Sequence, residues 1–161
     1  MSNANTHDIQ VLNGLIRVTI DSADGYRDAA TSSTDPGHQE LFQTRDGERR
    51  RVAEQLGTSV KALGGDPTSE GSFIAKAQRA FGDVSHALLR DELSVVGPVE
   101  SAEDAVRAKF EKALEDSHIS ALTRDTIRRA WLQLEGDHAA VRDIKHRLEG
   151  QRDASNRLFP Q

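Results

Sequence analysis

The chain has 161 residues, of which 36% are hydrophobic, 29% are charged and 4% are aromatic, and its formal net charge is −5. It contains no cysteine, which excludes disulfides, thiolate metal sites and cysteine nucleophiles. The acidic balance argues against nucleic acid as a partner, and no apolar run approaches the ~20 residues of a membrane helix. Because the first residues also lack the pattern of a secretory signal, we expect a cytoplasmic protein. From the length of the chain we expect a single domain.

Apolar residues recur at intervals of three and four along the first half of the chain, which predicts two long helices. The first is expected over residues 7–30 and ends in the Thr-Ser-Ser-Thr-Asp-Pro-Gly stretch at 31–37. The second is expected over 36–63, with Pro36 in its first turn. The Gly-Gly-Asp-Pro sequence at 64–67 predicts where this second helix stops.

The second half of the chain shows the same helical spacing. We expect a helix over 72–90, a long helix over 98–116 and a last helix over 119–148. Residues 149–161 are polar, and we expect them to form a flexible tail outside the domain, which then spans 7–148.

The lengths of the links determine how these helices are arranged. Short links at 31–35 and 116–118 make neighbouring helices antiparallel, whereas the long middle connection, with its own helix, can cross the bundle. We therefore predict an all-α fold, an antiparallel four-helix bundle with a helical crossover between its second and third long helices.

Polar side chains interrupt the apolar stripes of three long helices. Glu48 and Glu103 fall on inward positions of the second and third helices, and His138 falls on the stripe of the last helix. Glu135 precedes His138 by one helical turn, so both side chains can point at one ion. Carboxylates and a histidine inside a bundle are typical donors for iron or manganese. We therefore predict four metal ligands, Glu48, Glu103, Glu135 and His138.

Several short motifs stand out along the helices: Leu-Asn-Gly-Leu-Ile at 12–16, Asp-Gly-Tyr-Arg-Asp-Ala-Ala at 24–30, Val-Ala-Glu-Gln-Leu at 52–56, Lys-Ala-Leu-Gly-Gly at 61–65 and Phe-Glu-Lys-Ala-Leu at 110–114. With these motifs the chain resembles a family of small bacterial ferritin-like four-helix-bundle proteins of unassigned function. This likeness covers about residues 8–148, and it implies a ferritin-like fold.

The metal pattern of ferritin-like proteins asks for a Glu from each of two helices and a Glu-x-x-His from each of the other two. Glu135 and His138 match one such pair, and Glu103 matches a single Glu. On the second helix, Arg51 stands where the histidine after Glu48 belongs. The first helix offers Thr19 and Ala23 instead of a ligand. This partial match favours a mononuclear or vacant site over a two-metal centre.

Each candidate ligand also has an interpretation without metal. Glu48 can pair with Arg45, which precedes it by one turn, and His138 can be a hydrogen-bonded core histidine. Glu135 lies near the edge of its stripe and can be solvated. The Arg49-Arg50-Arg51 run is expected to form a solvated helix face rather than a site for phosphate or an acidic partner.

Two functions of different classes therefore stay open. One is a partial carboxylate and histidine metal site that handles iron or manganese, for example in stress. The other is a non-catalytic bundle with a metal-free core that forms a homodimer or docks another protein. No phosphate-binding, dinucleotide-binding or hydrolase motif is present, so we assign no catalytic residue and lean towards a protein that is not an enzyme.

Overall fold

The computed structural model describes residues 3–71 and 92–159, apart from the side chain of His138. Five helices lie in these ranges: α1 (Asn3–Ser32), α2 (Pro36–Ala62), α4 (Glu92–Glu115), α5 (Ala121–Leu134) and α6 (Asp137–Leu158). These ranges contain no strand. The helix expected over 72–90 falls outside the described residues. None of the helices in the described ranges is long and apolar enough to cross a membrane.

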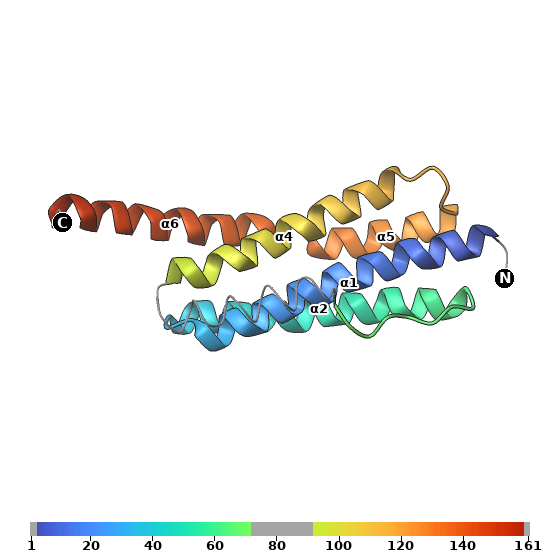
Figure 1. Ribbon diagram of the computed structural model, residues 1–161, viewed down its shortest axis with the longest axis horizontal. Helices are drawn as coiled ribbons and strands as arrows, with labels where there is room; N and C mark the ends of the chain where they lie inside the picture. The colour runs from blue at the N-terminus through green and yellow to red at the C-terminus, as the bar shows by residue number, and fades with distance from the viewer. Residues whose placement is uncertain (1–2, 72–91, 160–161) are drawn as a thin grey trace.

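The helices form an antiparallel four-helix bundle, and α5 followed by α6 makes its fourth rod (Figure 1). Helix α1 packs against α2 and α4, helix α4 also packs against α5 and α6, and α5 packs against α2. Short links at 33–35 and 116–120 join the antiparallel neighbours. The all-α bundle predicted from the helical spacing is therefore confirmed.

Local sequence signals set both ends of α2 as predicted. Asp35 caps the start, because its Oδ1 accepts a hydrogen bond from the His38 backbone N–H at 3.1 Å, and Pro36 follows in the first turn. At the other end, Gly64 adopts a φ of +84°, and the Gly65 N–H donates to the Val60 carbonyl at 3.0 Å. A left-handed residue after a helix favours glycine because glycine has no Cβ.

A carboxylate holds the link at each end of the bundle. Glu92, in the first turn of α4, accepts hydrogen bonds from the Ser33 and Thr34 hydroxyls, and its Oε2 lies 2.9 Å from His38 Nδ1. At the opposite end, the buried Asp8 accepts from the hydroxyls of Ser120 and Thr123. Each carboxylate thus ties the start of one helix to another rod.

The apolar core consists of two clusters. One lies towards the α5 end and includes Leu12, Leu56, Phe110 and Ile127. The other lies towards the α6 end and includes Tyr26, Phe42, Val99, Val141 and Ile144. Between these clusters each of the four rods contributes buried polar side chains.

The last rod differs from the single helix predicted over 119–148. Helix α5 ends at Leu134, and α6 begins at Asp137 after Gly136, whose φ is +99°. The helical spacing of apolar residues continues across this break, which explains why periodicity alone misses it. The third long helix also starts earlier than predicted, at Glu92, and contains Pro98.

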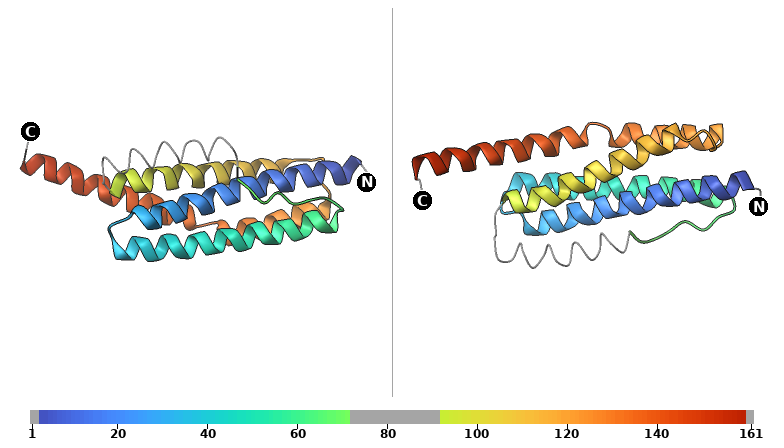
Figure 2. Two further views of the ribbon diagram at one scale, coloured as in Figure 1. Left: turned by 60° about the horizontal axis from the view of Figure 1, so that its bottom comes forward. Right: turned by 45° about the horizontal axis from the view of Figure 1, so that its top comes forward.

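Helix α6 continues through residues 149–158, where we expected a flexible tail. Every side chain from Gly150 to Phe159 is exposed. This part of α6 projects beyond the other helices in all three views (Figures 1 and 2).

Candidate functional site

A buried arginine occupies the centre of the bundle. The Arg49 side chain, on α2, is 0% exposed. Its Nη2 lies 2.9 Å from both carboxylate oxygens of Glu103 on α4, and its Nη1 donates to Asp137 Oδ2 on α6 at 2.7 Å. The planar guanidinium group suits this geometry, because its fixed donors can serve two carboxylates at once.

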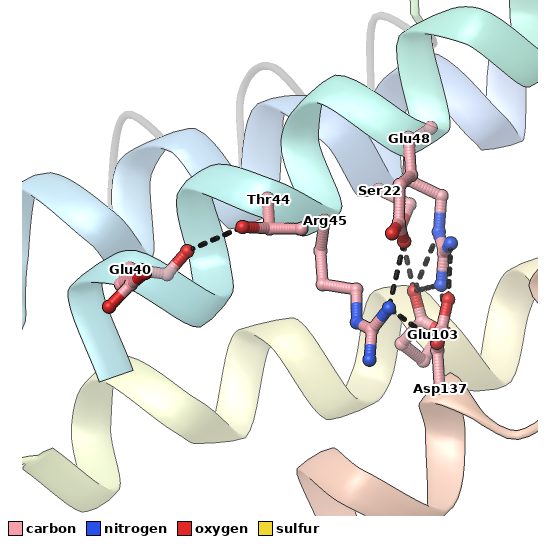
Figure 3. A network of polar contacts seen from close by, with 8 residues as sticks. Ser22, Glu40, Thr44, Arg45, Glu48, Glu103 and Asp137 are labelled. Atoms are coloured by element: carbon pink, nitrogen blue, oxygen red, sulfur yellow. Dashed lines mark hydrogen bonds and ion pairs between the residues drawn. The ribbon is translucent and has the colours of Figure 1, made fainter. Parts of the chain in front are cut away.

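Further contacts complete a network that joins all four rods, which we call the central network: Ser22, Tyr26, Arg45, Glu48, Arg49, Glu103 and Asp137. The Ser22 hydroxyl on α1 donates to Glu103 Oε1 at 2.8 Å. Arg45 Nη1 lies 2.8 Å from Glu48 Oε2 and 2.9 Å from Asp137 Oδ1 (Figure 3). The Tyr26 ring faces the Arg49 guanidinium, whose Cζ lies 5.6 Å from the ring centroid.

Electrostatics fixes the charge states of two members of the network. Burial alone would lower the pKa of Arg49, but the negative charge of Glu103 and the contact with Asp137 raise it, so the guanidinium stays charged. Burial and the neighbouring Glu103 carboxylate raise the pKa of Tyr26 far above its ordinary value of 10.0. Tyr26 is therefore a neutral phenol at physiological pH.

Of the predicted metal ligands whose side chains are described, Glu48 and Glu103 both belong to the central network, whereas Glu135 does not. Glu103 is buried as its inward position implies, but both of its oxygens are held by Arg49. Glu48 is half-buried and pairs with Arg45. Glu135 is exposed at the C-terminal end of α5, and the side chain of His138 lies outside the described residues.

This arrangement does not fit a metal centre. Among the described residues, no group of three or more His, Asp or Glu side chains is placed so that it could hold a metal ion. The break at Gly136 also puts Glu135 and His138 on different helical segments, so they no longer form one helical turn. Metal binding by these residues stays a prediction, which the experiments below test.

The expectation that Arg49 belongs to a solvated face is wrong. The buried stripe of α2 contains Phe42, Arg49, Val52, Leu56 and Val60, whereas the predicted inward position was that of Glu48. Neighbouring residues on a helix differ in direction by roughly 100°. An error of one position in the inward direction of α2 therefore selects Glu48 in place of Arg49. The seven-residue spacing of Phe42, Arg49 and Leu56 is the signal that would have identified it.

Sequence reasoning also missed Asp137, because a continuous last helix gives this residue no special position. In the structure it is the first residue of α6, and its side chain is 10% exposed. A carboxylate at a helix N-terminus is favoured by the helix dipole, and here it also meets two guanidinium groups.

Comparison with known proteins agrees with this fold. The family described as Domain of unknown function (DUF2383) matches residues 7–116. A search of curated proteins finds no significant match. The solved structure of a mutant of Dps1 from Mycobacterium smegmatis superposes with a TM-score of 0.71 at 13% sequence identity, covering 90% of this chain and 99% of that one. The chain therefore belongs to the family described as Domain of unknown function (DUF2383), and its fold is the ferritin-like fold of Dps.

Proposed function

We propose that this protein is a non-catalytic ferritin-like bundle that acts by associating with other protein chains, first of all with a second copy of itself. Its interior carboxylates neutralise Arg49 and take no part in metal chemistry. The observation that carries the metal-free part of the proposal is the position of the Arg49 guanidinium between Glu103 and Asp137, with no exposure to solvent.

The charge of the central network supports a role without metal. Buried carboxylates need a positive partner, because an uncompensated buried charge is costly. In a metal centre the ion supplies that charge, whereas here Arg45 and Arg49 face the carboxylates of Glu48, Glu103 and Asp137. A metal ion would have to displace a guanidinium group that already forms short contacts with two of these carboxylates.

A buried polar layer also suits a protein whose function depends on a defined shape. Apolar side chains can pack in several registers, whereas a charged network is satisfied in only one, as buried polar residues in coiled coils illustrate. On each rod the polar residues lie between the two apolar clusters, so sliding α2 by one turn would separate Arg49 from both Glu103 and Asp137. We propose that the network sets the register of the four rods.

Metal analysis tests the proposal directly. Protein purified without chelator and then incubated with ferrous or manganous ion should carry far less than one metal ion per chain after desalting. Its thermal midpoint should also stay unchanged in excess metal, because a ligand that binds only the folded state would raise it.

The matched variants are Glu103→Gln and His138→Ala, measured beside the wild type. One metal ion per chain in the wild type, lost in both variants while helicity by circular dichroism is kept, would overturn the metal-free proposal. It would instead support iron or manganese handling through Glu48, Glu103, Glu135 and His138. Light scattering gives the oligomeric state, and a strict monomer at every concentration would contradict association with a second copy.

A further inference from the structure

Helix α5 carries an exposed apolar and charged stripe on the side that faces away from the core. Leu122 and Leu132 are 71% and 62% exposed, although both are large apolar residues. Between them, Arg129 Nη2 and Asp125 Oδ2 form an ion pair at 3.2 Å. We call these four residues, Leu122, Asp125, Arg129 and Leu132, the outer face of α5.

The outer face lies opposite the buried side of the same helix. The buried residues of α5 are Thr123, Ile127, Ala130 and Leu134. At roughly 100° per residue, the two sets point in nearly opposite directions. The outer face is therefore not part of the packing that builds this bundle.

The spacing of side chains on the outer face is the same in both directions, whereas the sign of the two charges is exchanged. Leu122 and Leu132 lie five residues before and after Ile127, and Asp125 and Arg129 lie two residues before and after it. If the same helix is laid against it in the antiparallel direction, Leu122 meets the second copy's Leu132. Asp125 then meets the second copy's Arg129, and each of these contacts occurs twice.

We propose that the outer face of α5 is the surface through which two copies of this chain associate. The two α5 helices would lie antiparallel, with the two-fold axis crossing them at the level of Ile127. This inference rests on the proposed function and specifies its first partner and surface. A two-fold interface uses the same patch on both copies, so the patch must be complementary to itself. The outer face meets that requirement, because leucine then faces leucine and aspartate faces arginine.

The small buried area and the exposed ion pairs predict a weak, reversible dimer. Helix α5 has 14 residues, so it is only about 21 Å long and cannot by itself bury the roughly 800 Å² per partner of a standard interface. An exposed ion pair within one chain adds little to stability. Across the two-fold axis the same charges would form a four-membered network, which determines the direction of pairing more than its strength.

Charge reversal at the outer face gives a test that depends on the pairing itself. Asp125→Arg leaves two arginines on the outer face of each copy, and Arg129→Asp leaves two aspartates. Like charges then face each other across the two-fold axis. Each variant alone should therefore be monomeric in sedimentation velocity from micromolar to millimolar concentration. An equimolar mixture of the two variants should form a dimer again, because every arginine then faces an aspartate.

The control is Glu111→Arg on α4, which disrupts a comparable exposed ion pair with Arg107, at 3.0 Å, and should leave the dimer intact. Leu132→Glu should abolish association in every combination. Dimers that persist in both single charge variants would overturn the outer face as the interface while leaving self-association, and hence the proposed function, in place. A mixture that stays monomeric would overturn the antiparallel pairing.

Discussion

A guanidinium group at the centre of a helix bundle must exchange its hydration for fixed partners. Arg49 does so through Glu103 and Asp137, with Ser22 and the Tyr26 ring completing its surroundings. Replacing such a network by apolar residues is often neutral, whereas removing only one partner leaves an uncompensated charge. The stability of the protein therefore depends on every charged member of the central network having its partner.

Arg49→Met should lower the free energy of unfolding by about 3–5 kcal/mol, because Glu103 is left buried without a positive partner and Asp137 keeps only Arg45. Urea denaturation at neutral pH measures this loss. Arg51→Met is the matched control: its side chain is exposed two positions along the same helix, and the change should stay within about 0.5 kcal/mol.

The same network predicts strong coupling between Arg49 and Glu103. In the Arg49→Met background, Glu103→Leu should recover part of the lost stability, although Glu103→Leu alone should destabilise the protein. A double-mutant cycle from the same urea data gives the coupling energy. Simple additivity of the two changes would mean that Arg49 is stabilised by something other than this carboxylate.

Glu92 makes stability depend on pH. Burial would raise the pKa of its carboxyl, but the hydrogen bonds from His38, Thr34 and Ser33 lower it below the ordinary value of 4.5. A carboxyl with a lowered pKa in the folded state stabilises the protein above pH 4.5 and loses this effect as the pH falls through the folded-state pKa. The urea midpoint should therefore fall in acid, and it should fall less in Glu92→Gln. Equal acid sensitivity of the two proteins would remove Glu92 as the cause.

At the scale of the helices, the break at Gly136 divides the last rod into α5, which packs on α2 and α4, and α6, which packs on α4. Gly136→Ala should destabilise the protein by about 1–2 kcal/mol, because a φ of +99° is strained for alanine. No neighbouring atom lies within 4 Å of the added Cβ, so the loss is purely conformational.

Gly47→Ala provides a control of opposite sign. Gly47 lies inside α2, has no positive φ, and an added Cβ also meets nothing within 4 Å. Alanine should there stabilise the protein by roughly 0.5–1 kcal/mol. Thermal unfolding of the two variants side by side separates backbone strain from steric effects, and a stabilising Gly136→Ala would contradict the left-handed turn.

The projecting part of α6 should be the least protected helix segment among the described residues. Amides of residues 150–158 should exchange with deuterium much faster than those of 141–148, because every residue of the former segment is exposed whereas Val141 and Ile144 are buried. Hydrogen exchange read by mass spectrometry measures the difference. Equal protection along the whole of α6 would indicate that a second chain covers the projecting part.

Element positions could be predicted from the sequence more reliably than the site. The cap at Asp35, the stop at Gly64 and the apolar spacing defined α1 and α2 closely, because these signals are local. Which arginine of the 49–51 run is buried depends on the rotation of α2 against three other rods, and the sequence indicates it only through the seven-residue spacing of Phe42, Arg49 and Leu56. The break before Asp137 was missed for a related reason, since a single glycine interrupts an otherwise continuous apolar pattern.

At the scale of the whole molecule, polar groups divide the bundle into layers. Asp8 and Glu92 lie at opposite ends, and the central network lies between the two apolar clusters. Each layer ties together helices that are distant in sequence, so each helps to select one arrangement of the rods. Of the side chains expected to converge on an ion, Glu48 and Glu103 lie in the central network, and Glu135 lies at an exposed helix end.

The direction of α6 gives the molecule two well-separated attachment points. His7, near the start of α1, contacts Asp116 at 2.8 Å, whereas the last turns of α6 project past the opposite end of the rod (Figure 1). A fluorophore or fused domain placed beyond Phe159 would stand clear of the core, and one placed before Asn3 would sit at the far extremity. The molecule would then hold two attached groups apart by about its full length.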